Sequence, residues 1–199
     1  MPNQKLLQLL ETARECRLCE ADLPSGCRPV LRASESARLL VVGQAPGRRV
    51  HASGIPWDDP SGERLRHWMG TETALFYDAS RIAIIPMGLC YPGKGKHGDL
   101  PPDPRCAPLW HTRLRPALGN IELTLLIGQY AQKHYLGRRC HGTLTETVRH
   151  YRDYLPEFLP MPHPSPRNML WLKRNPWFEA DVVPWLRARI TELFCLPAD

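Results

Sequence analysis

Short apolar runs that alternate with helix-like stretches are the feature that most limits how this chain can fold. The runs span Arg38–Gly43, Arg81–Pro86 and Glu122–Gly128, with a weaker fourth at Phe158–Met161. Uninterrupted apolar strands that end in glycine or proline are typical of a parallel sheet buried on both faces. Helix-like sequence lies at residues 3–15, 61–69, 104–118, 129–136 and 176–194. The alternation predicts an α/β fold, a three-layer αβα sandwich with a central four-stranded, mainly parallel sheet.

The chain shows no internal repeat and no low-complexity linker, so residues 1–199 are expected to form a single domain. In sheets of this kind, ligands bind beside the carboxyl ends of the strands. Four loops leave those ends, at residues 43–47, 86–98, 128 and 161–168. We expect these loops to converge on one rim and to carry the functional groups.

The charge balance is basic, because 26 Lys and Arg residues against 20 Asp and Glu residues give a formal net charge of +6. A basic chain favours a polyanionic partner such as nucleic acid, although charge alone identifies none. No stretch approaches the roughly 18 apolar residues of a membrane span, and the first residues lack the apolar core of a signal peptide. We therefore expect a cytoplasmic protein with no membrane partner.

Seven cysteines, an odd number without a secretory signal, argue against a disulfide framework and favour metal ligation or plain buried thiols. Four of them form two spaced pairs: Cys16 with Cys19, and Cys90 with Cys106. The other three are surplus to these pairs: Cys27, Cys140 and Cys195. Of these, Cys27 lies close enough in the sequence to substitute for a neighbour.

Two of the four loops contain distinctive sequence. The first reads Gly43-Gln-Ala-Pro-Gly47, a tight turn whose backbone N–H groups can face an anionic or carbonyl ligand. It is neither a phosphate-binding loop nor a dinucleotide fingerprint, so no nucleotide cofactor is expected. The last reads Met161-Pro-His163-Pro-Ser-Pro166, in which three prolines hold one histidine rigidly after a strand. That histidine is either a catalytic group or an ordinary packed side chain; the rigid loop favours catalysis.

Taken together, these loops resemble the uracil-DNA glycosylase superfamily, and most closely its iron–sulfur (family 4) branch. Between them, Gly54-Ile-Pro56-Trp57 and Gly62 fall at the spacings of that branch. The resemblance implies the fold of that superfamily and a monomeric enzyme of base-excision repair. Its substrate would be DNA that contains a deaminated base, and the reaction would hydrolyse the N-glycosidic bond of a flipped-out uracil.

The resemblance also implies roles for individual residues. His163 would donate to uracil O2 and stabilise the negative charge left on the base, and the amides of Gln44 and Ala45 would line the same pocket. Gln44 occupies the position of a family glutamate and is a candidate catalytic residue. Trp57, where the family has phenylalanine, would stack on the base; packing in the core is its alternative role. The DNA backbone would meet Arg48, Arg49, Lys94, Lys96, Ser165, Arg167 and Asn168.

By the same resemblance, the two cysteine pairs would hold a [4Fe–4S] cluster through four thiolates. The ligands would be Cys16, Cys19, Cys90 and Cys106. A four-cysteine zinc site and four reduced thiols are the alternatives that the spacing leaves open.

Three departures from the family separate this chain from an ordinary member. Gln44 replaces a glutamate, the basic run 48–51 replaces an acidic one, and Pro86 stands where an asparagine reads the edge of uracil. Asp58 is the candidate substitute for the missing water-placing carboxylate, with His51 as a second candidate base. We therefore expect a divergent pocket that takes uracil weakly or prefers another deaminated base.

Two alternative functions stay open on the same fold. A non-catalytic protein that binds DNA or a damaged base would explain the lost carboxylates. A cluster-free enzyme that acts on another nucleic acid, including RNA, would explain four cysteines that hold no iron.

Overall fold

A four-stranded parallel sheet forms the centre of the molecule in the computed structural model, which describes residues 4–96 and 98–196. The strands are β1 (Leu39–Val42), β2 (Ile82–Ile84), β5 (Leu123–Ile127) and β6 (Phe158–Met161), in the spatial order β2-β1-β5-β6. Leu39 pairs with Ile82 on one side and with Leu123 on the other. The predicted strands are confirmed, and the sheet is parallel throughout.

The weakest predicted strand, β6, lies at an edge of the sheet and pairs only with β5. This position suits Pro160, which has no N–H to donate to a neighbouring strand. The edge placement explains why a strand that contains proline is compatible with the fold.

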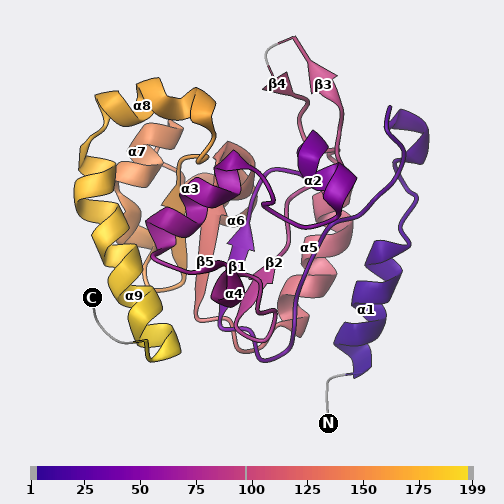
Figure 1. The fold of residues 1–199 in the computed structure, drawn as a ribbon, viewed down its shortest axis with the longest axis horizontal. Coiled ribbons are helices and arrows are strands. Elements are labelled where there is room, and N and C mark those ends of the chain that lie inside the picture. Colours follow the sequence, from indigo (N-terminus) through magenta and orange to yellow (C-terminus); the bar gives the residue numbers. More distant parts are fainter. Residues whose placement is uncertain (1–3, 97, 197–199) are drawn as a thin grey trace.

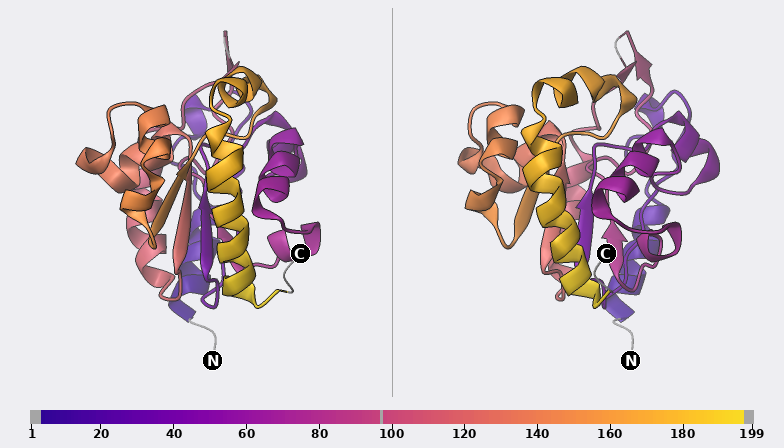
Figure 2. Two further views of the ribbon diagram at one scale, coloured as in Figure 1. Left: turned by 90° about the vertical axis from the view of Figure 1, so that its left-hand side faces the viewer. Right: turned by 60° about the vertical axis from the view of Figure 1, so that its left-hand side comes forward.

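Helices cover both faces of the sheet, which confirms the three-layer sandwich (Figures 1 and 2). One face packs against α1 (Gln4–Arg14), α5 (Cys106–Ala117) and α6 (Gln129–Leu136). The opposite face packs against α3 (Pro60–Met69) and α9 (Val183–Phe194). Alternate strand residues supply the two cores: Leu40 and Val42 face the first layer, whereas Leu39 and Val41 face the second.

Several short elements were not predicted, because they are too brief to show a periodic pattern. The helical ones are α2 (Arg48–Ser53), α4 (Thr73–Phe76), α7 (Leu144–Arg149), α8 (Met169–Arg174) and the single turns Glu20–Asp22, Gly137–Arg139, Tyr151–Tyr154 and Pro166–Asn168. A two-stranded hairpin, β3 (Lys94–Gly95) and β4 (Gly98–Asp99), forms where the sequence suggested only a glycine-rich loop. The last predicted helix is a π-helical turn, Phe178–Val182, that leads into α9. Residue 3, predicted to begin the first helix, lies outside the described residues.

The short elements gather at the edge of the sheet where the strands end. Figure 1 shows α2, the β3–β4 hairpin and α8 together at this edge, above the carboxyl end of β1. Among the described residues, no helix has the length and apolar character needed to cross a membrane.

Candidate active site

One cavity opens at the carboxyl ends of the strands, and we call it the rim cavity. Its walls come from the loop after β1, Pro86 after β2, the β3–β4 hairpin and the loop after β6. The lining residues used below are Gly43, Gln44, Ala45, Gly47, Trp57, Asp59, Pro86, Asp99, His163, Ser165, Arg167 and Asn168. Three of the four predicted loops therefore line one cavity. Gly128 lies beneath them, where an added Cβ would be 4.0 Å from the Cβ of His163.

The loop after β1 is held by the chain that follows β2. The backbone N–H groups of Met87 and Gly88 donate to the carbonyls of Gly43 and Gln44, both at 2.9 Å. In the described part of the chain, the N–H groups of Gln44 and Ala45 donate to no backbone carbonyl. Two backbone donors thus remain available to a ligand at the rim. The Gln44 side chain instead reaches the hairpin, where its Nε2 donates to the carbonyl of Leu100 at 3.2 Å.

His163 has a defined tautomer. The backbone N–H of Ser165 donates to His163 Nδ1 at 3.2 Å, so the proton of the neutral ring sits on Nε2. Burial lowers the pKa of His163 below its usual value, against a smaller opposing effect of Asp59. The imidazole is therefore neutral at neutral pH and keeps Nε2–H as a donor.

Hydrogen bonds to its backbone carbonyls hold the His163 loop in place. Asn168 Nδ2 donates to the carbonyl of His163 at 2.8 Å. Arg64 donates to the carbonyls of Pro164 and Ser165, both at 3.2 Å. The donor at Nε2 is thus carried by a loop that is fixed from two sides.

Trp57 lies against His163 in the cavity wall, with ring centroids 5.6 Å apart and an interplanar angle of 33°. Its backbone is left-handed, with φ of 58°, an uncommon conformation for a bulky residue. Two motif glycines make room for it: a Cβ on Gly43 would be 2.7 Å from the indole, and a Cβ on Gly62 would overlap the Trp57 carbonyl. Arg66 also donates to that carbonyl at 3.3 Å. The spacing of these glycines therefore reflects the placement of one aromatic ring.

The carboxylates near Trp57 face different ways. Asp58 is exposed and does not line the rim cavity; its charge acts on Tyr77, whose pKa burial raises and Asp58 raises further. Asp59 does line the cavity, and its Oδ1 accepts from the N–H of Gly62 at 2.8 Å, which caps the start of α3. Asp99, a carboxylate that the sequence motifs do not indicate, also lines the cavity. The water-placing role of Asp58 stays a prediction.

Buried side chains hold Pro86, which contributes no side-chain donor or acceptor to the cavity. His111 of α5 donates from Nε2 to the Pro86 carbonyl at 2.9 Å, and its Nδ1 accepts from the Tyr135 hydroxyl at 2.7 Å. Burial lowers the pKa of His111 to about 4 and raises that of Tyr135. This neutral pair fixes the end of β2 from behind. His51 lies outside the cavity lining, with its ring 5.9 Å from that of Tyr91.

The residues predicted to meet DNA belong to α2, the β3–β4 hairpin and the chain after β6; Figure 1 shows α2 and the hairpin at the same edge of the sheet. Arg48 and Arg49 are exposed on α2, and Lys94 and Lys96 are exposed on the hairpin. Ser165, Arg167 and Asn168 follow β6 and line the cavity. Of the predicted cations, Arg167 lines the cavity itself, and the other four are exposed on α2 and the hairpin.

A second cavity, which we call the thiol cavity, gathers five of the seven cysteines. Its walls include Cys16, Cys19, Cys27, Cys90 and Cys106, together with Leu89 and Trp110. The four predicted ligands are thus brought together from the segment after α1, the segment after β2 and the start of α5, and Cys27 joins them. Burial raises the pKa of Cys19 to about 11 and those of Cys90 and Cys106 to about 12.

The thiol cavity offers the ligand type that an iron–sulfur cluster takes, since five of its lining residues are cysteines. In residues 4–96 and 98–196, no three His, Cys, Asp or Glu side chains are arranged to hold one metal ion. A four-iron cluster separates its thiolates, because each binds a different iron. Backbone N–H groups also donate to cysteine sulfurs, a contact that tunes clusters in iron–sulfur proteins. The N–H of Leu89 donates to Cys106 Sγ at 3.3 Å, and the N–H of Arg28 donates to Cys90. The donor set therefore fits the cluster that the sequence predicts.

Comparison with known proteins agrees with the loops. The family model of the uracil DNA glycosylase superfamily matches residues 32–187, which include every loop of the rim cavity. Among solved structures, the chain is similar to the solution NMR structure of a "putative Uracil DNA glycosylase" from Methanosarcina acetivorans. That protein is 14% identical, and the alignment covers 80% of this chain and 97% of the other with a TM-score of 0.47. On the family match, this chain belongs to the uracil DNA glycosylase superfamily.

Proposed function

We propose that this protein is a DNA glycosylase that hydrolyses the N-glycosidic bond of uracil or another deaminated base in DNA. Its reaction would leave an abasic site for base-excision repair. We also propose that it acts as a cytoplasmic monomer. The observation that carries the proposal is the fixed, neutral His163, whose Nε2–H is available beside an aromatic ring and two unpaired backbone donors.

The chemistry follows from the charge that develops on the base. Breaking the bond between C1′ of the sugar and the ring nitrogen leaves its electron pair on the base. A donor placed at the base oxygen lowers the barrier because it is oriented before the reaction begins. A neutral imidazole keeps this donor without placing a full charge in the cavity. Trp57 would stack on the extruded base, a contact typically worth about 1–3 kcal/mol.

The base that is removed depends on the wall formed by Pro86. The proline side chain has no donor or acceptor that could read the edge of a pyrimidine. The Pro86 carbonyl is already bound by His111, so it does not replace the missing side chain. This absence of a reader supports weak or relaxed selection of uracil. Hypoxanthine and xanthine are therefore the competing substrates to test.

We further propose that Cys16, Cys19, Cys90 and Cys106 hold a [4Fe–4S] cluster in the thiol cavity. When bound, the cluster would supply structural cross-links rather than the reacting groups, because the thiols and His163 lie in separate cavities. The cysteines themselves would join α1, α5 and the segment after β2.

A strand-scission assay tests the proposed function. Labelled single-stranded and duplex oligonucleotides, each with one uracil, hypoxanthine or xanthine, are incubated with the protein and then with alkali. We expect cleavage at the modified base, and His163→Ala should reduce it by roughly 100- to 1,000-fold. Cleavage that persists in His163→Ala would indicate a contaminating glycosylase.

Two other results would favour the alternatives. Tight binding of the modified strands without release of any base would indicate a binding protein. Activity on RNA by protein that contains no iron would indicate the cluster-free enzyme.

A further inference from the structure

The rim cavity has two chemically different ends, and the loop after β1 runs between them. At the Gly43 end lie Trp57 and His163, whose rings contact one another. At the Gly47 end lie two carboxylates: a Cβ on Gly47 would be 3.5 Å from Asp99 Oδ2 and 3.9 Å from Asp59 Oδ2. The donor and aromatic groups are therefore separated from the acidic groups within one cavity.

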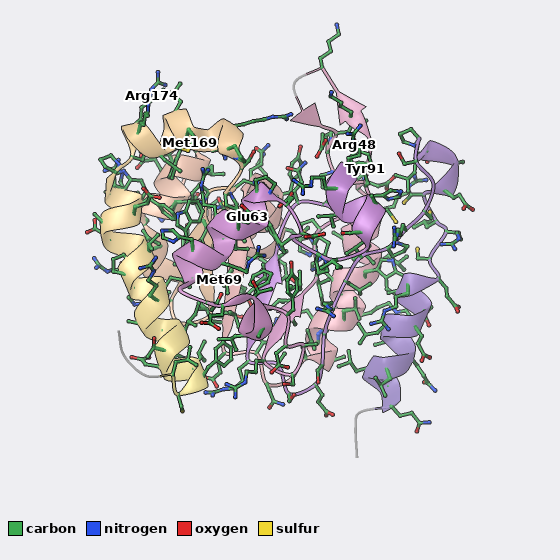
Figure 3. All side chains as sticks on the ribbon, viewed as in Figure 1. Arg48, Glu63, Met69, Tyr91, Met169 and Arg174 are labelled. Atoms are coloured by element: carbon green, nitrogen blue, oxygen red, sulfur yellow. The ribbon has the colours of Figure 1, made fainter. Side chains whose placement is uncertain are left out.

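Asp99 belongs to the hairpin and lies near a buried aromatic residue. It ends the β3–β4 hairpin, where it pairs with Lys94. Burial raises the pKa of Tyr91, a buried side chain, and the nearby Asp99 carboxylate raises it further. Arg48 lies next to Tyr91 under the hairpin (Figure 3), and its charge also acts on the Tyr91 hydroxyl. The carboxylate thus lies near a buried phenol, while the Asp99 side chain itself is exposed at the cavity.

The neighbouring carboxylates are less suited to hold a water molecule in this cavity. Asp58 is exposed and lies outside the lining. Asp59 lines the cavity, but one of its oxygens caps α3 through the N–H of Gly62. Asp99 combines a place in the lining with a carboxylate that caps no helix.

We propose that Asp99 is the catalytic carboxylate that positions and deprotonates the attacking water in this protein. The proposal rests on the proposed glycosylase function and assigns a residue from the hairpin rather than from the loop after β1. It also gives the hairpin a role, because this element brings to the cavity a carboxylate that caps no helix, unlike Asp59.

The step balances as a hydrolysis. The bond between C1′ and the base nitrogen breaks, and its electron pair leaves with the base, whose oxygen receives a hydrogen bond from His163. The water oxygen forms a bond to C1′, and its proton passes to the Asp99 carboxylate. Asp99 then releases the proton to solvent, and the base anion takes one from solvent. The products are the free base and an abasic deoxyribose.

Single-turnover excision on the best base from the strand-scission panel tests the assignment. We expect Asp99→Asn to lower the excision rate at least about 100-fold, as for loss of a general base. DNA affinity should stay within about threefold, because the side chain acts on the water rather than on the base. Tyr91→Phe removes the neighbouring hydroxyl and leaves the carboxylate, so its effect on the rate should be much smaller than that of Asp99→Asn. Asp153→Asn, the same change on an exposed aspartate outside the cavity lining, is the matched control.

The pH profile separates catalysis from a structural role. In the wild type the rate should fall as pH decreases, because protonation removes the base; in Asp99→Asn this decline should be absent. Thermal melting of both proteins shows whether the variant is folded. A folded Asp99→Asn protein with the wild-type rate would overturn the proposal, and loss of activity in Asp58→Asn instead would return the role to Asp58. A wild type that releases no base from any substrate would overturn the glycosylase function, and this assignment with it.

Discussion

The rim cavity and the thiol cavity lie on either side of one short segment, yet they are stabilised differently. In the rim cavity, protein hydrogen bonds already hold the important groups: Ser165 orients His163, and His111 binds the Pro86 carbonyl. In the thiol cavity, five sulfurs face one another among apolar side chains, and burial keeps three of them protonated. Protein hydrogen bonds thus orient the groups of the rim cavity, whereas the thiols of the second cavity would be fixed by the proposed cluster.

This difference separates two kinds of mutational effect. Changes in the rim cavity should act mainly on rate, because its groups are held independently of one another. Changes in the thiol cavity should act mainly on stability, because metal binding contributes to folding free energy.

The largest expected effect is loss of a thiol ligand. Cys106→Ser removes a buried sulfur that accepts a backbone N–H, and we expect loss of bound iron and destabilisation by several kcal/mol. Iron content, the visible absorption spectrum and the melting temperature measure this. Cys195→Ser, on an exposed cysteine outside the cavity, is the control. Equal iron and equal melting in the two variants would contradict the cluster.

The second effect is on the pH dependence of stability and concerns α5, which lines the thiol cavity and whose His111 binds the Pro86 carbonyl. The native pKa of His111, about 4, lies below the value of about 6.5 expected in the unfolded chain. The unfolded state therefore binds more protons between these values, and stability should fall by up to about 3 kcal/mol as pH decreases from 6.5 to 4. Denaturant unfolding at several pH values measures it. In His111→Gln this part of the decline should disappear; an unchanged slope would show that other groups cause it.

The smallest effect tests the tautomer of His163 directly. Ser165 has φ of −57°, which proline adopts, so Ser165→Pro removes the N–H donor to His163 Nδ1 with little backbone change. We expect about a fivefold lower excision rate, in line with one hydrogen bond of about 1 kcal/mol. Ser165→Ala keeps the N–H and loses only the hydroxyl that caps the next turn. Equal rates in the two variants would show that the tautomer does not depend on this donor.

Much of the architecture follows from local sequence. Each strand is a self-contained apolar run, and its burial on both faces makes the pattern readable without knowledge of its neighbours. The hairpin and α2 gave no such signal, because Lys94–Gly95 and Arg48–Ser53 are short and largely polar. Short elements are fixed by tertiary contacts, which a local pattern does not contain.

The site was predictable where one loop carries several groups, and harder to predict where distant segments meet. His163 and Trp57 were expected in one pocket, and the structure places them in contact. Which of Asp58 and Asp59 faces the cavity depends on the left-handed backbone of Trp57, which redirects the chain just before them. Asp99 arrives from the hairpin, so only the folded structure brings it beside Gly47.

The segment from Pro86 to Cys90 limits how sequences of this type can diverge. Pro86 lines the rim cavity and Cys90 the thiol cavity, while Met87 and Gly88 donate to the loop after β1. An inserted or deleted residue here would shift the cysteine relative to the catalytic loop and break both hydrogen bonds. Side chains in the segment can therefore change during evolution while its length stays constant. A survey of natural variants should find substitutions there without gaps.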